Sequence, residues 1–191
     1  MPGEIAGLNA LVSKWGNRTW SQDMEPAIAL ATTGPMVTKH VKMVLTRFGK
    51  DLPTLVPEFA ADWMPGGTVR AEGERAPRLK LAATLQAIAA QGPKALYEGQ
   101  TAAAIERAAA SAGGSVTAAE LGQYKVIERD PLHVSHHRDG HIREVYTMPP
   151  PSAGGLMLVQ AIVADDLWRA KGKGLERDAW NSGPYLHRVA E

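Results

Sequence analysis

The sequence predicts an α+β fold that is mostly helical, with a few strands in its C-terminal half. Apolar residues recur at steps of three and four over much of residues 1–123, the period of helices with one buried face. Residues of high β propensity gather in short runs over about 125–147. A proline-rich corner at 149–155 and helices over 155–191 complete the predicted order.

Apolar stripes place the helices of the first part. The clearest stripes lie at 5–15, 37–48 and 81–88, each with apolar residues three and four apart. Pro26 is expected at the first position of a further helix, where its missing amide costs nothing. Residues 53–76 are expected to be irregular, because prolines and glycines break every long period there.

A change of period marks the strands. The segment Thr117-Ala-Ala-Glu120 has the form of a capping box and predicts the start of a short helix. Strands are then expected near 125–129, 132–137 and 141–147. The last two are predicted to form a hairpin with a turn at Asp139-Gly140.

A rigid corner follows the strands. It consists of Pro149, Pro150, Pro151, Ser152, Ala153, Gly154 and Gly155. The prolines hold the backbone extended, and the glycines allow a close approach and a sharp turn into a buried helix at about 155–169. A serine-hydrolase elbow reads Gly-x-Ser-x-Gly, and Pro150 replaces its first glycine. Ser152 is therefore expected to cap the helix, and catalytic use of its hydroxyl is not expected.

Composition excludes several classes of function. The formal net charge of +1 gives no electrostatic reason to expect nucleic acid as a partner. The absence of cysteine excludes disulfides, thiolate metal sites and cysteine nucleophiles. The longest apolar run, 156–164, is too short to span a bilayer, so no membrane span is expected.

Histidines are the first candidates for chemistry. Four of them lie close together: His133, His136, His137 and His141. A hairpin could gather three imidazoles around a zinc or nickel ion, with His133 and His137 on one strand face. The alternative is a polar hairpin facing water, and it is favoured because no carboxylate has the spacing of a metal motif beside them. No metal ligand and no cofactor are therefore assigned.

Asp165 and Asp166 are adjacent carboxylates near the end of the predicted apolar helix. Neighbours on a helix point about 100° apart, so the two are not expected to share a proton. A solvated helix face is the favoured interpretation.

The corner also carries a family resemblance. Residues 148–160 read Met-Pro-Pro-Pro-Ser-Ala-Gly-Gly-Leu-Met-Leu-Val-Gln, which resembles the Pro-Pro-Pro-Ser-x-Gly-Gly signature of γ-glutamyltranspeptidases (γ-glutamyltransferases). Other segments agree in the same order: Pro2-Gly3 with Ala6-Gly7-Leu8, Trp20 with Pro26-Ala27-Ile28, 81–89 with Gly92, Tyr97-x-Gly99, Gly113-Gly114 with Thr117, Leu121 and Tyr124, and 185–191. The resemblance spans nearly the whole chain.

The resemblance implies an N-terminal nucleophile hydrolase fold, in which two central sheets lie between helical layers (αββα). Such enzymes are made as a precursor that cleaves itself, and the N-terminal threonine of the small subunit becomes the nucleophile. It attacks the γ-glutamyl carbonyl of glutathione or a related compound, and the glutamyl group passes to water, an amino acid or a peptide. An arginine early in the large subunit binds the substrate carboxylate. Bacterial members are usually periplasmic or secreted.

The chain departs from the full pattern of the family. The arginine belongs before Pro2-Gly3, and the threonine belongs after the last predicted helix, which has no terminating residue before the chain stops. Thr32-Thr33 does not match the cleavage junction. No residue of 1–191 is assigned a catalytic role, and the chain is interpreted as a partial domain from the middle of a large subunit. The isolated chain is expected to be inactive; the alternative is a non-catalytic scaffold or binding protein derived from the same fold.

Overall fold

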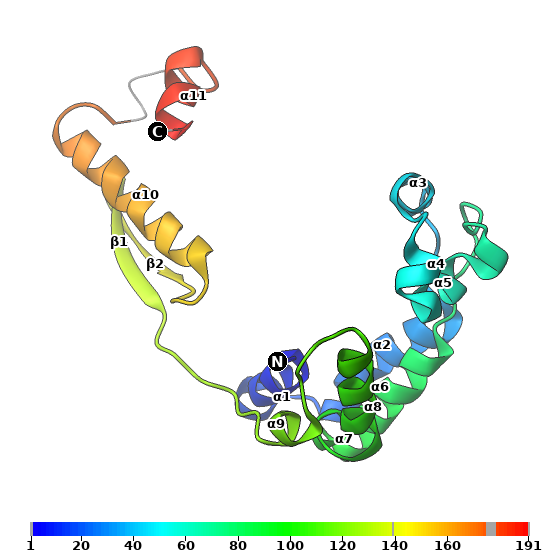
Figure 1. The fold of residues 1–191 in the computed structure, drawn as a ribbon. Helices are drawn as coiled ribbons and strands as arrows, with labels where there is room; N and C mark the ends of the chain where they lie inside the picture. Colours follow the sequence, from blue (N-terminus) through cyan, green and yellow to red (C-terminus); the bar gives the residue numbers. More distant parts are fainter. Residues whose placement is uncertain (1, 139, 175–178, 191) are drawn as a thin grey trace. The chain divides into compact units, whose positions relative to one another are not determined.

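The chain folds as two compact units, Met1–Val126 and Ile127–Glu191 (Figure 1). The computed structural model describes residues 2–138, 140–174 and 179–190. Most elements are helices, and the described residues contain one two-stranded sheet. The prediction of a mostly helical chain with strands in its C-terminal half is confirmed. That both units belong to one domain of a larger protein stays a prediction.

The first unit is helical. Its elements are α1 (Glu4–Trp15), α2 (Trp20–Thr33), α3 (Lys39–Phe48), α4 (Leu52–Leu55), α5 (Pro57–Trp63), the 3₁₀ turn η1 (Pro65–Gly67), α6 (Leu79–Gln91), α7 (Lys94–Tyr97), α8 (Gly99–Ser111) and α9 (Ala118–Gly122).

The second unit joins a hairpin to two helices. Its elements are β1 (Leu132–Arg138), β2 (His141–Thr147), α10 (Ala153–Ala170) and α11 (Gly183–Ala190).

Tyr97 connects the start of α1 to the core of the first unit through hydrogen bonds. Its ring is buried with Leu121, and it stacks on Tyr124 with ring centroids 5.6 Å apart. The Tyr97 hydroxyl donates a hydrogen bond to the Pro2 carbonyl at 2.8 Å and accepts one from the Ala6 amide at 3.3 Å. The preceding Gly3 offers α1 no side-chain cap, so the tyrosine satisfies one of the amides that a helix N-terminus leaves unpaired.

The helix α2 begins earlier than the position of its proline predicts. Thr19 and Gln22 form a capping box that starts the helix, and Pro26 lies inside it. The expectation that Pro26 is a first helical residue is wrong, because the capping box decides the start. Proline has no amide for the carbonyl four residues earlier, and the Arg18 guanidinium donates to that Gln22 carbonyl at 3.1 Å instead. The helix then packs on α6, where the Trp20 indole donates to the Ile88 carbonyl at 3.0 Å.

Two extended segments, 34–37 and 73–78, pair between α2 and α6 and form a neck. The Val37 amide donates to Glu74 at 2.8 Å, and the Gly73 amide donates to Val37 at 2.9 Å. At Gly34, φ is 83°, and a Cβ there would lie 2.4 Å from the Pro77 nitrogen. Both backbone conformation and space therefore require glycine at this crossing.

The segment 38–72, which connects the two paired segments of the neck, contains more regular structure than predicted. Residues 53–76 were expected to be irregular, but Pro53, Pro57 and Pro65 stand at the first or second positions of α4, α5 and η1. Proline suits those positions because its missing amide has no helical partner there. The stripe expected at 37–48 is only partly covered, since Val37 and Leu45 are buried while Phe48 is 69% exposed.

The second unit begins with an irregular segment. The strand predicted near 125–129 is absent, because no described segment pairs with it. The other two strands are confirmed as the antiparallel pair β1–β2, in which Val134 lies opposite Val145. The predicted turn at Asp139-Gly140 lies partly outside the described residues, which omit 139.

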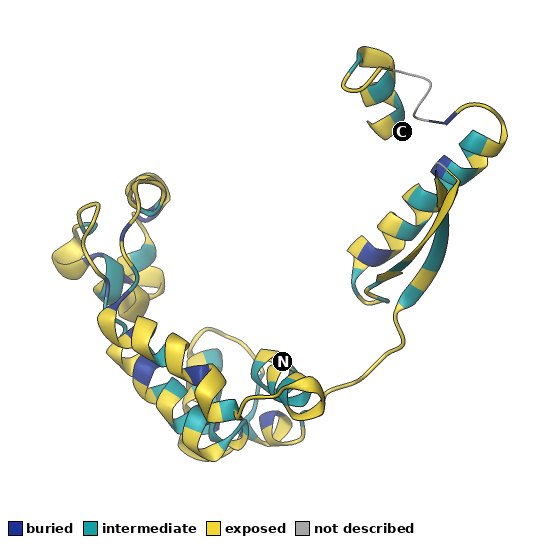
Figure 2. Cartoon of the chain, turned by 180° about the vertical axis from the view of Figure 1, so that it is seen from behind, coloured by how far each residue is buried: buried dark blue, intermediate teal, exposed yellow. Residues whose placement is uncertain are grey.

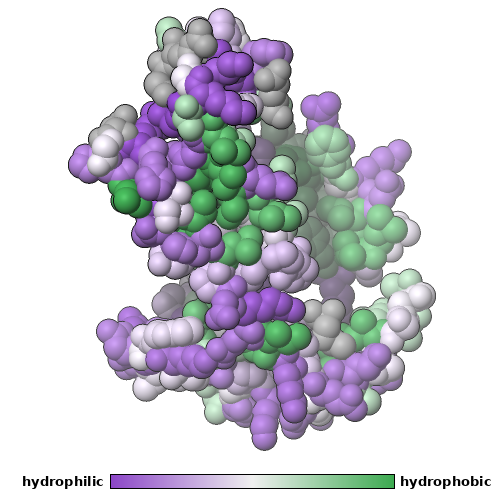
Figure 3. Space-filling view, turned by 90° about the vertical axis from the view of Figure 1, so that its left-hand side faces the viewer, coloured by the Kyte–Doolittle hydropathy of each residue, from purple (hydrophilic) through white to green (hydrophobic). Residues whose placement is uncertain are grey.

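The helix α10 covers one face of the hairpin and leaves much of its own surface open (Figures 1 and 2). Within Ala153–Ala170, only Gly155 and Asp165 are buried. Its exposed apolar side chains are Leu156, Met157, Leu158, Val163 and Leu167. Figure 3 shows hydrophobic atoms gathered over the part of the surface that contains α10. The prediction of a buried helix is therefore wrong for this chain, whose described elements cover α10 on one side only.

Candidate functional site

The corner that leads into α10 is built on a close backbone contact. A Cβ on Gly155 would lie 1.9 Å from the carbonyl oxygen of Met148, while a Cβ on Gly154 would meet no atom within 4 Å. Ser152 is the N-cap residue of α10, but its side chain makes no capping hydrogen bond. Its amide donates to Pro149 at 3.2 Å, and the Pro150–Pro151 peptide bond is cis. The close contact therefore leaves no room for a side chain at position 155, whereas position 154 has room for one.

The hairpin does not gather the four histidines at one point. The register places His133 and His137 on the face away from α10, as alternation predicts, and His136 and His141 on the opposite face. His133 stacks on Tyr146 with ring centroids 4.6 Å apart and hydrogen-bonds to Glu144. Three imidazoles around one ion are therefore not present in the described hairpin.

Glu144 organises the outer face of the hairpin. The Ser135 hydroxyl donates to the Glu144 carboxylate at 2.9 Å. This bond, followed by the hydrogen bond with His133, lowers the pKa of Glu144 from its usual value. Glu144 is thus held as a carboxylate in an exposed polar group.

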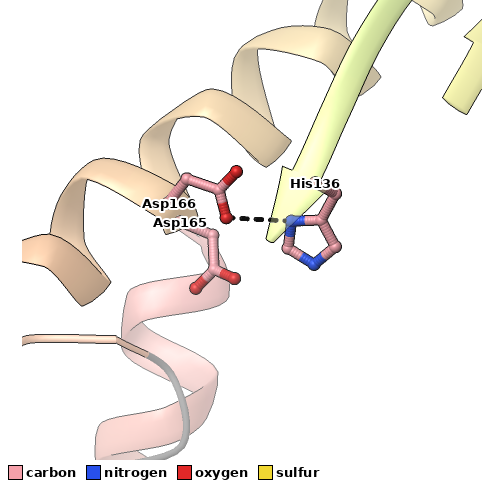
Figure 4. A group of neighbouring side chains, drawn as sticks. All are labelled: His136, Asp165 and Asp166. Carbon is pink, nitrogen blue, oxygen red and sulfur yellow. Dashed lines mark hydrogen bonds and ion pairs between the residues drawn. The ribbon is translucent and has the colours of Figure 1, made fainter. Parts of the chain in front are cut away.

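On the inner face, His136 of β1 meets two carboxylates of α10 (Figure 4). The His136 Nδ1 atom lies 3.0 Å from Asp166 Oδ1, and the His137 amide donates to the other Asp166 oxygen at 3.4 Å. The side chains of His136 and Asp166 are 15% and 23% exposed, so this contact is largely withdrawn from water.

Asp165 is buried beside this pair. Its Oδ2 atom accepts a hydrogen bond from Arg169 Nε at 2.7 Å, one helical turn further along α10. The expectation that Asp165 and Asp166 form a solvated face is therefore wrong. The physical reason differs for the two residues: β1 packs on α10 and brings His136 to Asp166, whereas Asp165 pairs with Arg169 of its own helix away from solvent.

The cluster of His136, Asp165 and Asp166, which we call the inner-face cluster, is the group within the described residues that could hold a metal ion. One potential ligand atom from each residue lies within 4.8 Å of the others. Chemically, the cluster can exchange a proton between imidazole and carboxylate or bind a cation; it contains no hydroxyl nucleophile. Sequence reasoning missed it, although alternation along β1 already separates His136 from His133 and His137.

Comparison with known proteins defines the class of this chain. The family model for γ-glutamyltranspeptidase matches residues 1–191. The chain therefore belongs to the γ-glutamyltranspeptidase family, and the resemblance predicted from the corner motif is confirmed.

Individual relatives agree with this assignment. The chain is 32% identical over 162 residues to the glutathione hydrolase proenzyme of Escherichia coli, covering 84% of this chain and 27% of that protein. It is 33% identical over 162 residues to the acylase ACY 1 proenzyme of a Pseudomonas species, covering 85% of this chain and 28% of that protein. The chain thus spans about a quarter of the length of these relatives.

A solved structure gives the same result. The γ-glutamyltranspeptidase of Helicobacter pylori is 28% identical, with a TM-score of 0.85 that covers 100% of this chain and 52% of that one. The described residues include no helix with both the length and the apolar character needed to cross a membrane.

Proposed function

We propose that this chain is the middle of the large subunit of a γ-glutamyltransferase-like enzyme. The enzyme cleaves the γ-glutamyl amide of glutathione or a related compound and transfers the glutamyl group to water, an amino acid or a peptide. The observation that carries the proposal is the family match over residues 1–191, supported by the structural likeness over the same length.

In the proposed reaction, the nucleophile lies outside this chain. The N-terminal threonine of the small subunit attacks the γ-glutamyl carbonyl, and its α-amine accepts the hydroxyl proton. Backbone amides stabilise the oxyanion, and the amine leaves with a proton. Water or an amino group then attacks the acyl-enzyme. An arginine ahead of residue 1 binds the substrate carboxylate with two parallel hydrogen bonds.

This chain contributes scaffold to that enzyme. The first unit supplies part of a helical layer, and the β1–β2 hairpin with the 149–155 corner supplies strands of an αββα arrangement that supports an active site built elsewhere. The open apolar surface of α10 supports this assignment, because a helix with exposed Leu156, Met157 and Leu167 is stabilised when further elements cover it. We propose that those elements come from the rest of the precursor and from the small subunit.

Two measurements test the proposal. The first is to sequence the gene beyond the codons for Met1 and Glu191 and to express the whole open frame. We expect it to reach a threonine at a cleavage junction and to give two polypeptides that release nitroaniline from γ-glutamyl-p-nitroanilide. The second is to assay the isolated 191-residue chain, which should release none.

The two assays also separate the alternatives. Turnover by the isolated chain would overturn the assignment of the nucleophile to another segment. Stop codons on both sides, together with a stable product, would favour the non-catalytic scaffold or binding protein.

A further inference from the structure

The inner-face cluster has a feature that its internal hydrogen bonds do not explain. Asp165 is only 9% exposed, and its Oδ1 atom is buried without a hydrogen-bond partner among the described residues. Arg169 satisfies the other oxygen of the same carboxylate. A buried carboxylate oxygen that lacks a partner is costly, because it has lost water and gained nothing in exchange. A positively charged group at this oxygen would remove that cost.

The surroundings of Asp165 supply the other ligands for such a group. One atom each from His136, Asp165 and Asp166 lies within 4.8 Å of the others, and the three residues come from two packed elements, β1 and α10. Figure 4 shows the Asp166 carboxylate facing the His136 ring, with Asp165 beside Asp166 on the helix. An imidazole nitrogen and two carboxylate oxygens form a donor set that binds zinc.

We propose that His136, Asp165 and Asp166 bind one divalent transition-metal ion, with Zn²⁺ as the best match. Three protein ligands leave a fourth position for water. The imidazole favours zinc over calcium and magnesium, which prefer sites made of oxygen alone. Zinc ligands lie about 3.4 Å from one another in a tetrahedron, so no pair of these atoms, all within 4.8 Å of one another, would need to close by more than about 1.4 Å.

Arg169 has a supporting role in this site. By donating to Asp165 Oδ2 it fixes the carboxylate and leaves Oδ1 for the ion, as outer partners of metal ligands commonly do. Without the ion, the carboxylates of Asp165 and Asp166 face the single guanidinium of Arg169 in this group. Two carboxylates and one guanidinium leave one negative charge in this group, so a bound divalent cation meets net attraction there. The site is independent of the proposed γ-glutamyl chemistry.

The test is a zinc titration of the full 191-residue chain by isothermal calorimetry in metal-free buffer. We expect one zinc ion per chain. His136→Gln and Asp166→Asn should each weaken binding at least about tenfold, because each removes one of three ligands. The matched control is His137→Gln, which changes the neighbouring histidine on the outer face and should leave the affinity unchanged. Circular dichroism checks that each variant keeps its helices.

A second measurement locates the ion. Hydrogen exchange of α10 peptides should slow when zinc is added to the unchanged chain and should not respond to zinc in His136→Gln. The absence of stoichiometric zinc binding by the unchanged chain would overturn the proposal and leave the cluster as a metal-free ion-pair network. Zinc binding that His137→Gln removes and His136→Gln preserves would also overturn it, because the exposed histidines would then be the ligands.

Discussion

Gly155→Ala is expected to loosen the second unit, whereas Gly154→Ala is not. The new Cβ at 155 would lie 1.9 Å from the Met148 carbonyl oxygen, about 1.5 Å short of ordinary contact at 3.4 Å. Overpacking of this kind costs about 1–3 kcal/mol, and alanine returns about 0.5–1 kcal/mol through its helix propensity. The net loss is therefore roughly 0–2.5 kcal/mol, with a central value of about 1 kcal/mol. Alanine at 154 has the same gain in helix propensity but no steric contact to overpack. The free energies of unfolding of the two variants should therefore differ by the overpacking cost alone, about 2 kcal/mol.

Hydrogen exchange measured by mass spectrometry on α10 peptides reads this difference locally. If the free energy of opening of α10 differs by about 2 kcal/mol, its amides should exchange roughly 30-fold faster in Gly155→Ala than in Gly154→Ala. Peptides from α6, in the other unit, serve as the internal reference. Equal exchange of α10 in the two variants would refute the reasoning, since it would mean that the Met148 carbonyl moves away without cost.

Two further predictions concern the first unit. Tyr97→Phe removes the hydroxyl that bonds to Pro2 and Ala6, and it should lower the free energy of unfolding by about 1–2 kcal/mol in urea titrations. Hydrogen bonds from the amide and hydroxyl of Thr117 lower the pKa of Glu120 from its ordinary 4.5. Because the folded pKa lies below the unfolded one, this contribution to stability is present above about pH 4.5 and is lost as the pH falls further. Glu120→Gln should therefore flatten the acid side of the stability profile.

A matched variant gives the first of these predictions its control. Tyr146→Phe removes a hydroxyl from a 64% exposed ring and should leave unfolding unchanged. A loss equal to that of Tyr97→Phe would contradict the role given to the Tyr97 hydroxyl. For the acid profile, an unaltered slope in Glu120→Gln would show that other carboxylates determine the acid response.

Local signals were sufficient for much of the helical part. The stripes at 5–15 and 81–88 coincide with α1 and α6, and the capping box at Thr117 and Glu120 is present as predicted. These features depend on residues a few positions apart, so the sequence alone contains what decides them. The misplaced start of α2 had a local signal as well, because Thr19-Trp-Ser-Gln22 also has the form of a capping box.

The errors arose where the outcome depends on a distant segment. Asp165 and Asp166 have the same sequence pattern whether water or β1 lies beside them, and Asp166 is covered because it pairs with His136, thirty residues away. The segment 125–129 has strand propensity, but a strand also needs a neighbour with which to bond. The apolar sequence of α10 likewise predicts that the helix packs against other elements. It does not identify the segment of chain that packs against it.

The neck formed by 34–37 and 73–78 affects how this part of the protein can change in length. The segment from α3 to η1 begins and ends at these two paired segments. Their hydrogen bonds hold its two ends together whatever its length. Doubling the length of such an excursion costs only about 0.6 kcal/mol in closure entropy. Insertions and deletions can therefore accumulate within 38–72 while the packing of α2 on α6 is kept. Relatives that differ greatly in size at this point can still share the same helical pair.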